Sequence, residues 1–353
     1  LFSGRLSGSF EYYIQKTNDI LLDVTMPSTS GVSSYTGNIG NTENKGFELT
    51  LNGIIIDNKN GWNWEAGINL YANHNKLTKL TGAQTADGKP ERDEANRWFV
   101  GHPIDVIYDY EYDGLWNESD VYEVTLADGT KTTNFAILEP GGNLGMIKVK
   151  YNDDVLDANG VPTRQIGSED RRIMSMEPDL IGGFNTTVGY KNFDLTMIGA
   201  FQIGGKLISA IHSSFGYLNM NSGRRNNLDI DYWTEDNTDA KYPRPGGIMS
   251  SDNPKYGSTL GVFDAGYLKM RAITLGYNFD RLSAVKNFGI SRLRIYATVQ
   301  NPLVIFSPFN NESGLDPETN SWANENTAVA VDGYTGKHKM PIVGYNTPAT
   351  RNS

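Results

Sequence analysis

The chain contains no cysteine among its 353 residues. This absence excludes disulfide cross-links and thiolate metal sites, although it leaves the cellular compartment open. The sequence also has no apolar run of about 18 residues, so we expect no transmembrane helix. Leu1-Phe2-Ser3-Gly4 lacks the basic start and apolar core of a signal peptide. Basic residues are outnumbered, since the formal net charge is -10, and this argues against a nucleic-acid partner.

What the sequence does have is a regular alternation of apolar and polar residues. In the segment from Trp62 to Asn73, aromatic and aliphatic residues alternate with Asn, Glu and Tyr. A period of two indicates a β-strand whose two faces meet different surroundings. Seven segments show this pattern: 5–15, 46–56, 62–73, 180–190, 193–203, 264–279 and 290–300. Most are about ten residues long, which is the span of a tilted strand in a membrane β-barrel.

The connections between these segments alternate in length. Short turns follow the second, fourth and sixth segments, and long polar stretches, such as 25–45, follow the first, third, fifth and seventh. This parity predicts an all-β fold, a transmembrane antiparallel β-barrel with long extracellular loops. Within the third loop, 104–116 also alternates, but parity excludes a single further crossing, so we expect structure inside or above the lumen. The alternation slips near Ala272, which predicts a β-bulge.

Aromatic residues gather beside the short turns. They are Trp62, Trp64, Tyr190, Phe193, Tyr277, Phe279 and Phe288. Amphipathic rings favour the lipid headgroup region, and girdles of such rings are typical of membrane barrels. The alternative interpretation is aromatic packing at the edge of a soluble sheet, and we favour the girdle.

Several stretches resemble a known family of membrane proteins, in the same order along nearly the whole chain. These stretches are Asn38–Leu49, Gly101–Ile104, Tyr108–Tyr110, Ile181–Phe184, Tyr190–Leu195, Phe201–Lys206, Leu268–Tyr277 and Leu293–Pro302. Together they are similar to the TonB-dependent outer-membrane transporters of the SusC/RagA type from Bacteroidetes.

This resemblance implies that residues 1–353 form the C-terminal portion of a single barrel domain of about 22 strands. The plug and the final strand are then expected outside this chain. The implied partners are the remainder of the barrel and its plug, outer-membrane lipid, a SusD-like surface lipoprotein that acts as a lid, and TonB. The implied activity is energy-dependent import of nutrient oligomers across the bacterial outer membrane, with an oligosaccharide as the favoured cargo and a peptide as the second.

We expect no cofactor. The four histidines stand far apart, without the spacing of metal ligands: His74, His102, His212 and His338. The acidic stretch 153–160 offers four candidate Ca²⁺ ligands: Asp153, Asp154, Asp157 and Asn159. Val155 and Ala158 depart from the EF-hand pattern, so a plain polar turn is the favoured interpretation.

Aromatic residues in the long loops are candidate substrate-binding groups, because flat side chains stack on the apolar faces of sugar rings. Neighbouring Arg, Asn and Asp side chains would bind sugar hydroxyls. The candidate residues are Arg97, Trp98, Tyr108, Tyr110, Asp113, Trp116, Asn117, Trp233 and Trp322. The alternative for each aromatic residue is a structural role, in which it holds loops together or docks the lid.

Two other classes of protein compete with this interpretation. A secreted β-sandwich, such as a lectin-like carbohydrate-binding module, would have shorter strands and two sheets packed face to face. An enzyme would need a catalytic constellation, and the sequence has no nucleophile elbow or phosphate-binding glycine loop. We therefore expect the chain not to be an enzyme.

Overall fold

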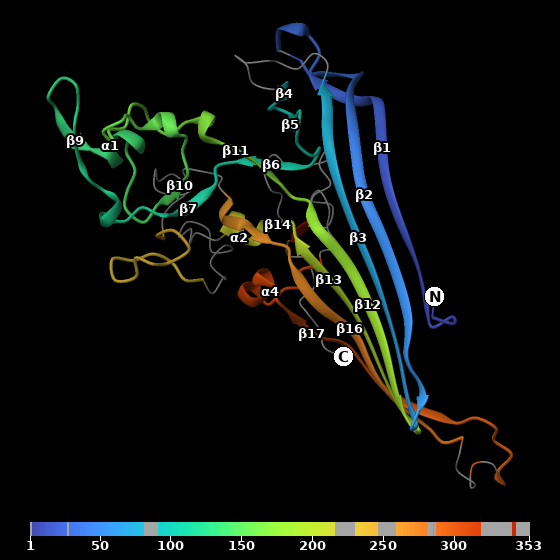
Figure 1. Cartoon of the computed structure of the whole chain (residues 1–353). Coiled ribbons are helices and arrows are strands. Elements are labelled where there is room, and N and C mark those ends of the chain that lie inside the picture. Colours follow the sequence, from blue (N-terminus) through green and yellow to red (C-terminus); the bar gives the residue numbers. More distant parts are fainter. Residues whose placement is uncertain are drawn as a thin grey trace.

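The fold is dominated by one antiparallel sheet of seven strands (Figure 1). The computed structural model describes residues 2–26, 28–80, 91–215, 230–245, 259–280, 285, 287–318 and 341–343. In spatial order the strands are β1 (Leu6–Thr25), β2 (Ser34–Lys59), β3 (Trp62–Leu80), β12 (Pro178–Tyr190), β13 (Phe193–Gly204), β16 (Tyr267–Asn278) and β17 (Arg294–Ile305). Each of the seven predicted segments corresponds to one of these strands, but their bounds differ: β1 runs to Thr25, and β17 spans Arg294–Ile305, where 290–300 was predicted.

The register of the sheet aligns the apolar residues of all seven strands on one face. One row across the sheet consists of Phe10, Leu49, Leu70, Gly182, Phe201, Leu268 and Ile305. The adjacent row, which points the other way, consists of Glu11, Glu48, Tyr71, Ile181, Gln202 and Tyr267. We call these sides the apolar face and the polar face. Phe10 and Ile295 on the apolar face are 66% and 60% exposed, so large apolar groups lie on the surface there.

Tight turns join the strands at the lower end of the sheet in Figure 1. Asn60 and Gly61 connect β2 to β3 with φ angles of 56° and 82°. Positive φ at both central residues is the geometry of the hairpin turn that matches strand twist, and Asn and Gly adopt it at low cost. Lys191, with φ of 55°, begins the two-residue turn from β12 to β13. Both predicted turns are confirmed.

Aromatic side chains form a belt beside these turns, as predicted. The ring centroids of Trp62 and Tyr190 are 4.5 Å apart. Those of Phe193 and Tyr277 are 4.7 Å apart, and so are those of Tyr277 and Phe279. The belt therefore runs across neighbouring strands at one level, which is the arrangement of a lipid-interface girdle.

The predicted bulge lies in β16. The pairing of β13 with β16 shifts between Ile198↔Ala272 and Gly199↔Met270, which leaves Arg271 as the extra residue. The pairing of β16 with β17 shifts at the same place. The change in phase near Ala272 was therefore a correct local signal.

One stretch predicted as a loop is mostly strand. Residues 25–45 were expected to connect the first two strands, but β2 begins at Ser34 and pairs with β1 out to Thr25↔Ser34. The long connection expected after the first strand is therefore wrong, and only 26–33 lie between the two strands. At ~3.3 Å per residue the 26 residues of β2 span ~86 Å, well beyond a hydrocarbon core of ~30 Å. In the outer part of this extension, 34–38, the residues are mostly exposed, so the alternation is not needed there.

The remaining elements are short and belong to the long connections. The strands are β4 (Arg92–Asp93), β5 (Trp98–Phe99), β6 (Val106–Asp109), β7 (Tyr112–Leu115), β8 (Glu123–Thr125), β9 (Lys131–Thr133), β10 (Ile147–Val149), β11 (Arg172–Ser175), β14 (Lys206–Ser209), β15 (Val262–Asp264) and β18 (Ile342–Val343). The α-helices are α1 (Asn134–Leu138), α2 (Ala210–Phe215) and α4 (Pro308–Ser313). The 3-10 turns are Ser28–Ser30, Glu118–Asp120, Asp153–Val155, Ser168–Asp170 and Thr259–Gly261. Within the described ranges, every helix is too short or too polar to cross a membrane.

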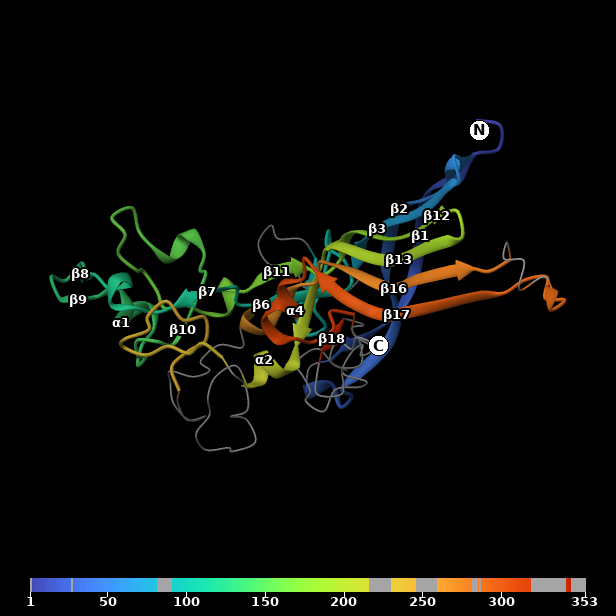
Figure 2. The same ribbon diagram turned by 90° about the horizontal axis from the view of Figure 1, so that it is seen from below.

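These connections fold at the end of the sheet away from the tight turns and extend to one side of it (Figures 1 and 2). They contact the polar face: the side chain of Asn75 in β3 accepts a hydrogen bond from the backbone N–H of Ile104 at 3.0 Å. The backbone N–H of Asn75 donates to Glu177 at 2.8 Å. The predicted strand-like segment 104–116 forms β6 and β7, which pair with β11 and β10 outside the large sheet, as expected.

Candidate functional site

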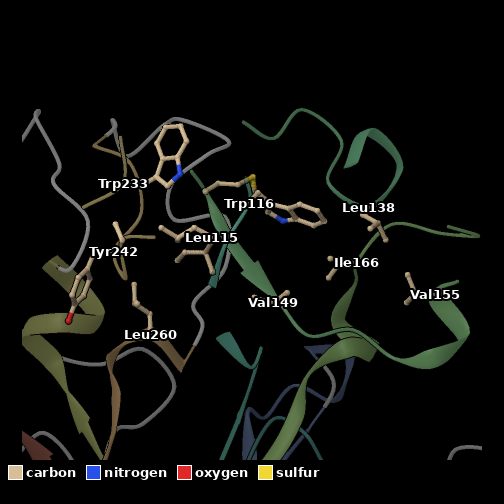
Figure 3. Packing of buried hydrophobic residues seen from close by; sticks show 12 residues of the cluster. Leu115, Trp116, Leu138, Val149, Val155, Ile166, Trp233, Tyr242 and Leu260 are labelled. Carbon is tan, nitrogen blue, oxygen red and sulfur yellow. The ribbon is translucent and has the colours of Figure 1, made fainter. Parts of the chain in front are cut away.

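A hydrophobic core holds the connection between β3 and β12 together, and we call this folded unit the outer lobe. Its buried residues include Leu115, Trp116, Leu138, Met146, Trp233 and Leu260 (Figure 3). Two connections that are far apart in the sequence contribute to this core. Trp233 and Leu260 come from the connection after β13, and the other four residues come from the connection between β3 and β12. The outer lobe is thus a small folded unit at the end of the sheet away from the tight turns, and its core fixes the conformation of the loops.

Three candidate binding residues lie within or against this core. Trp116 is 2% exposed, and its ring centroid is 4.9 Å from that of Phe135. Trp233 is 8% exposed, and its indole N–H donates to the Asn117 side chain at 2.7 Å. A Cβ at Gly145 would lie 2.4 Å from the Trp233 ring, so glycine is required where the indole meets the backbone. These contacts are those of residues that hold loops together, and the prediction that they contact a ligand is left without direct support.

A second group of candidates lies nearer the large sheet. Trp98 is 4% exposed and packs against Leu77 and Leu80 at the outer end of β3. Tyr108 is 8% exposed, with its ring centroid 4.8 Å from that of Phe99. These side chains anchor the β4–β5 hairpin and β6.

The other candidates lie more openly. Tyr110 is half-buried and Asp113 is exposed. Arg97 has a φ of 57° in the turn before β5 and contributes positive potential at Asp109. Trp322 lies outside the described residues.

Between the β4–β5 hairpin and the β6–β11 pair is a cavity of about 850 Å³. Its wall is unusually rich in charge and includes Arg92, Arg171, Arg172, Glu94, Glu111 and Tyr108. We call it the arginine cavity. Of the predicted site residues, only Tyr108 lies on its wall, and the arginines were not singled out from the sequence. Only folding brings them together, although the Arg171-Arg172 pair directly before a strand was a weak local signal.

Asp109 is a half-buried acidic residue on β6 that interacts electrostatically with Arg171 of the cavity wall. Burial raises the pKa of Asp109 to about 6, against the effects of the Tyr110 backbone N–H, which donates at 2.8 Å, and of the positive charges of Arg97 and Arg171. The group is thus close to half protonated in mildly acidic solution.

A second cavity, of about 540 Å³, lies on the polar face below the loops. Tyr71, Gln202 and Tyr267 from the sheet line it, together with Asp105 and Glu177 from the loops. The sheet thus presents a polar wall to an interior space, as the wall of an aqueous pore would.

The segment after α4 is held on this polar face by an ion-pair network. The ammonium of Lys269, a side chain with 6% exposure, is 2.5 Å from Asp316 and 2.9 Å from Glu318. Arg271, the bulged residue, is 2.5 Å from Glu318. A buried lysine is stable only with such partners, so this network ties the chain beyond β17 back to β16.

Two of the four candidate Ca²⁺ ligands, Asp154 and Asp157, have other side-chain partners in the structure. One Asp157 oxygen accepts hydrogen bonds from the backbone N–H groups of Asn159 and Val161, at 2.8 Å and 2.9 Å. Asp154 lies 3.1 Å from the guanidinium of Arg164. Among the described residues, no group of three or more His, Cys, Asp or Glu side chains is arranged to hold a metal ion. Calcium binding stays a prediction.

A buried serine at the end of β14 and a buried histidine in α2 invite comparison with a catalytic pair. Ser209 Oγ lies 2.6 Å from His212 Nδ1 and also accepts from the His212 backbone N–H at 3.3 Å. Ser209 is completely buried and His212 is 4% exposed, so no substrate reaches either atom. Burial also lowers the pKa of His212 to about 4. The pair therefore caps the start of α2, and it gives no support for catalysis.

The chain has relatives among curated proteins, although no protein-family model matches it. It is 32% identical over 334 residues to the TonB-dependent receptor P3 of Formosa agariphila, a match that covers 92% of this chain and 30% of that receptor. It is 28% identical over 337 residues to the TonB-dependent receptor SusC of Bacteroides thetaiotaomicron, covering 92% of this chain and 29% of SusC. The chain thus spans about 30% of the length of these relatives.

The fold matches a solved structure as well. The RagAB peptide transporter superimposes with a TM-score of 0.62 and 24% identity, covering 99% of this chain and 33% of the matched chain. In its 'open-open' state the RagAB peptide importer gives a TM-score of 0.60. At this identity the likeness shows a common fold.

Proposed function

Since the chain is a relative of the SusC/RagA-type TonB-dependent receptors, β-barrel proteins of the bacterial outer membrane, we propose that it serves as part of an active importer of nutrient oligomers. In this proposal the seven-stranded sheet is a section of the barrel wall, crossing the membrane once with each strand. The outer lobe and the arginine cavity form part of the extracellular capture surface. The proposed partners are the remainder of the barrel, its plug, TonB, outer-membrane lipid and a SusD-like lid.

The observation that carries this proposal is the two-faced sheet. Its apolar residues are in register across seven strands, and an aromatic belt crosses the sheet beside the tight turns. Hydrocarbon on that side accounts for the exposed apolar groups, since water would oppose so large a patch. The polar face instead carries Glu, Asn and Tyr side chains and supports the folded loops, as the inner wall of a pore would.

The same sheet disfavours the lectin-like module. A β-sandwich needs a second sheet of comparable size against the apolar face. In the part of the chain that the structure describes, every other sheet has only two or three strands. The chemistry proposed here is binding and passage of cargo, without any bond being made or broken, and the relatives are receptors and transporters rather than enzymes.

We propose an oligosaccharide as the cargo, because aromatic and amide side chains, among them Tyr71, Tyr267 and Gln202, line the cavity on the polar face. A peptide is the second candidate, and it is supported by the similarity to a solved peptide transporter. Both are oligomers that need an energised gate because they are too large for passive diffusion through a narrow pore.

Deletion of the gene tests the proposal. The deletion strain should lose growth on one polysaccharide or protein digest as sole carbon source, and a plasmid copy should restore it. Uptake of labelled oligomers should stop when a protonophore removes the energy that TonB relays. Normal growth on every polymer tried, or uptake that continues in the presence of the protonophore, would contradict the proposal. Recovery of the protein in a detergent-free soluble fraction would instead favour the lectin-like module.

A further inference from the structure

The exposed side chain of Arg171 lies on the wall of the arginine cavity, stacked on two tyrosine rings. Its guanidinium carbon is 5.9 Å from the ring centroid of Tyr108 and 5.2 Å from that of Tyr110. A guanidinium on aromatic faces loses freedom of movement but keeps its N–H groups directed outward in the plane of the fork. Arg171 is therefore positioned before any ligand arrives.

Among the described residues, Arg171 also forms no ion pair with a carboxylate, unlike the other arginines of the cavity wall. The acidic groups of the cavity wall are already engaged in ion pairs: Glu94 with Arg92 at 3.0 Å, Glu111 with Lys150 at 2.5 Å, and Glu169 with Arg164 at 3.0 Å. A fourth, Glu91, accepts a hydrogen bond from the backbone N–H of Leu80 at 3.1 Å. Within the described ranges, no carboxylate lies at ion-pair distance from Arg171, whereas Arg92 and Arg172 each have one.

The neighbouring arginine offers a second unused donor. The Nε–H of Arg172 is buried and makes no hydrogen bond in the described structure, and Glu111 lies 3.6 Å away. A buried donor without an acceptor is unfavourable, so an incoming acceptor at this place would be stabilised. The cavity wall thus places a buried N–H of Arg172 that lacks an acceptor next to Arg171, which has no ion-pair partner among the described residues.

We propose that the arginine cavity binds a carboxylate of the imported oligomer and that Arg171 is the residue that recognises it. The inference rests on the proposed function and narrows its cargo to acidic oligomers. Planar arginine forks bind carboxylates through two parallel hydrogen bonds, which neutral hydroxyl groups do not match in strength. Uronic acid units of an oligosaccharide and acidic side chains of a peptide both carry a carboxylate. The inference therefore concerns the carboxylate, and the experiment distinguishes a sugar from a peptide as its source.

Calorimetric binding to the intact purified receptor tests this inference. The probes are trigalacturonate, neutral galactotriose, end-capped triglutamate and end-capped triglutamine. One of the two acidic probes should bind to the unaltered receptor. Arg171→Gln should weaken the binding of that probe by about 10- to 100-fold, which is the effect of losing a charge-assisted contact. Arg171→Lys keeps the charge but loses the fork, so it should give an intermediate loss.

The matched control is the double variant K131Q/E123Q, which removes the exposed ion pair of the β8–β9 hairpin, outside the cavity wall, and should leave affinity unchanged. Weakening confined to trigalacturonate identifies an acidic sugar, and weakening confined to triglutamate identifies an acidic peptide. Equal affinity in R171Q, an equal loss in the control, or binding of neutral probes alone by the unaltered receptor overturns the inference. Growth and energised uptake test the proposed function separately, because an importer of neutral oligomers would still support growth and uptake.

Discussion

Replacing Trp116 tests whether the aromatic residues of the loops build the outer lobe or contact cargo. The Trp116 side chain is almost completely buried between Phe135 and the aliphatic part of the core. Its backbone is equally well held, with its N–H donating to Met146 at 3.0 Å and its carbonyl accepting from Gly145 at 2.7 Å. Trp116→Ala would therefore leave a large cavity in the centre of a small domain.

The size of the effect follows from burial and from one unsatisfied donor. A buried tryptophan covers ~200 Å² of surface, and Trp→Ala changes in cores cost about 3–5 kcal/mol. The indole N–H of Trp116, however, is buried without a hydrogen-bond partner. Trp116→Phe removes that N–H, which offsets part of the lost packing, so we expect a loss of only about 1–2 kcal/mol.

Hydrogen exchange in the intact receptor, followed by mass spectrometry, measures both variants. Amides of β7 and β10 in the W116A variant should exchange about a hundred-fold faster or more, while β12 and β13 of the large sheet keep their protection. In W116F the outer lobe should stay largely protected. Unchanged exchange in W116A, or equal effects of the two variants, would refute the reasoning. A W116F variant with a protected lobe but no cargo binding would show instead that the indole contacts cargo.

Two further predictions concern charged groups. Lys269→Met should leave the buried carboxylate of Asp316 without its cation, loosening the segment after α4 by about 3 kcal/mol and exposing it to protease. Adding Asp316→Asn should restore resistance, and unchanged cleavage of the single variant would contradict this role. Because burial raises the pKa of Asp109 to about 6, the folded lobe binds more protons than the unfolded chain between about pH 4 and pH 6, so its stability should fall as pH rises through that window. Asp109→Asn should remove this part of the slope, measured as the urea midpoint of tryptophan fluorescence, and an identical slope in the variant would be evidence against it.

Strands and turns were predictable because their signals are local. Each strand that meets lipid on one side and polar surroundings on the other must alternate, and the Asn60-Gly61 step suits a turn with positive φ. The bulge at Arg271 appeared as a change of phase. The extension of β2 from Ser34 to Lys45 was missed, because its outer part is exposed and its residues do not alternate between apolar and polar.

The candidate site was less predictable. An aromatic residue in a loop has the same local sequence whether it stacks on a sugar or fills a core, and only packing separates the two. Packing shows that Trp98 and Trp116 lie in hydrophobic clusters, which their local sequence did not indicate. Arg171 was overlooked because its importance comes from what surrounds it: two tyrosine rings below it and carboxylates already paired with other cations.

The amino-acid sequence by itself determined which faces of the sheet are apolar, where the strands turn and how they follow one another, since these depend on neighbours two to four residues apart. Tertiary structure decided which loop residues are buried and which charges are left unpaired. That second outcome depends on contacts between segments more than a hundred residues apart, such as Trp233 with Asn117, and no local pattern records them.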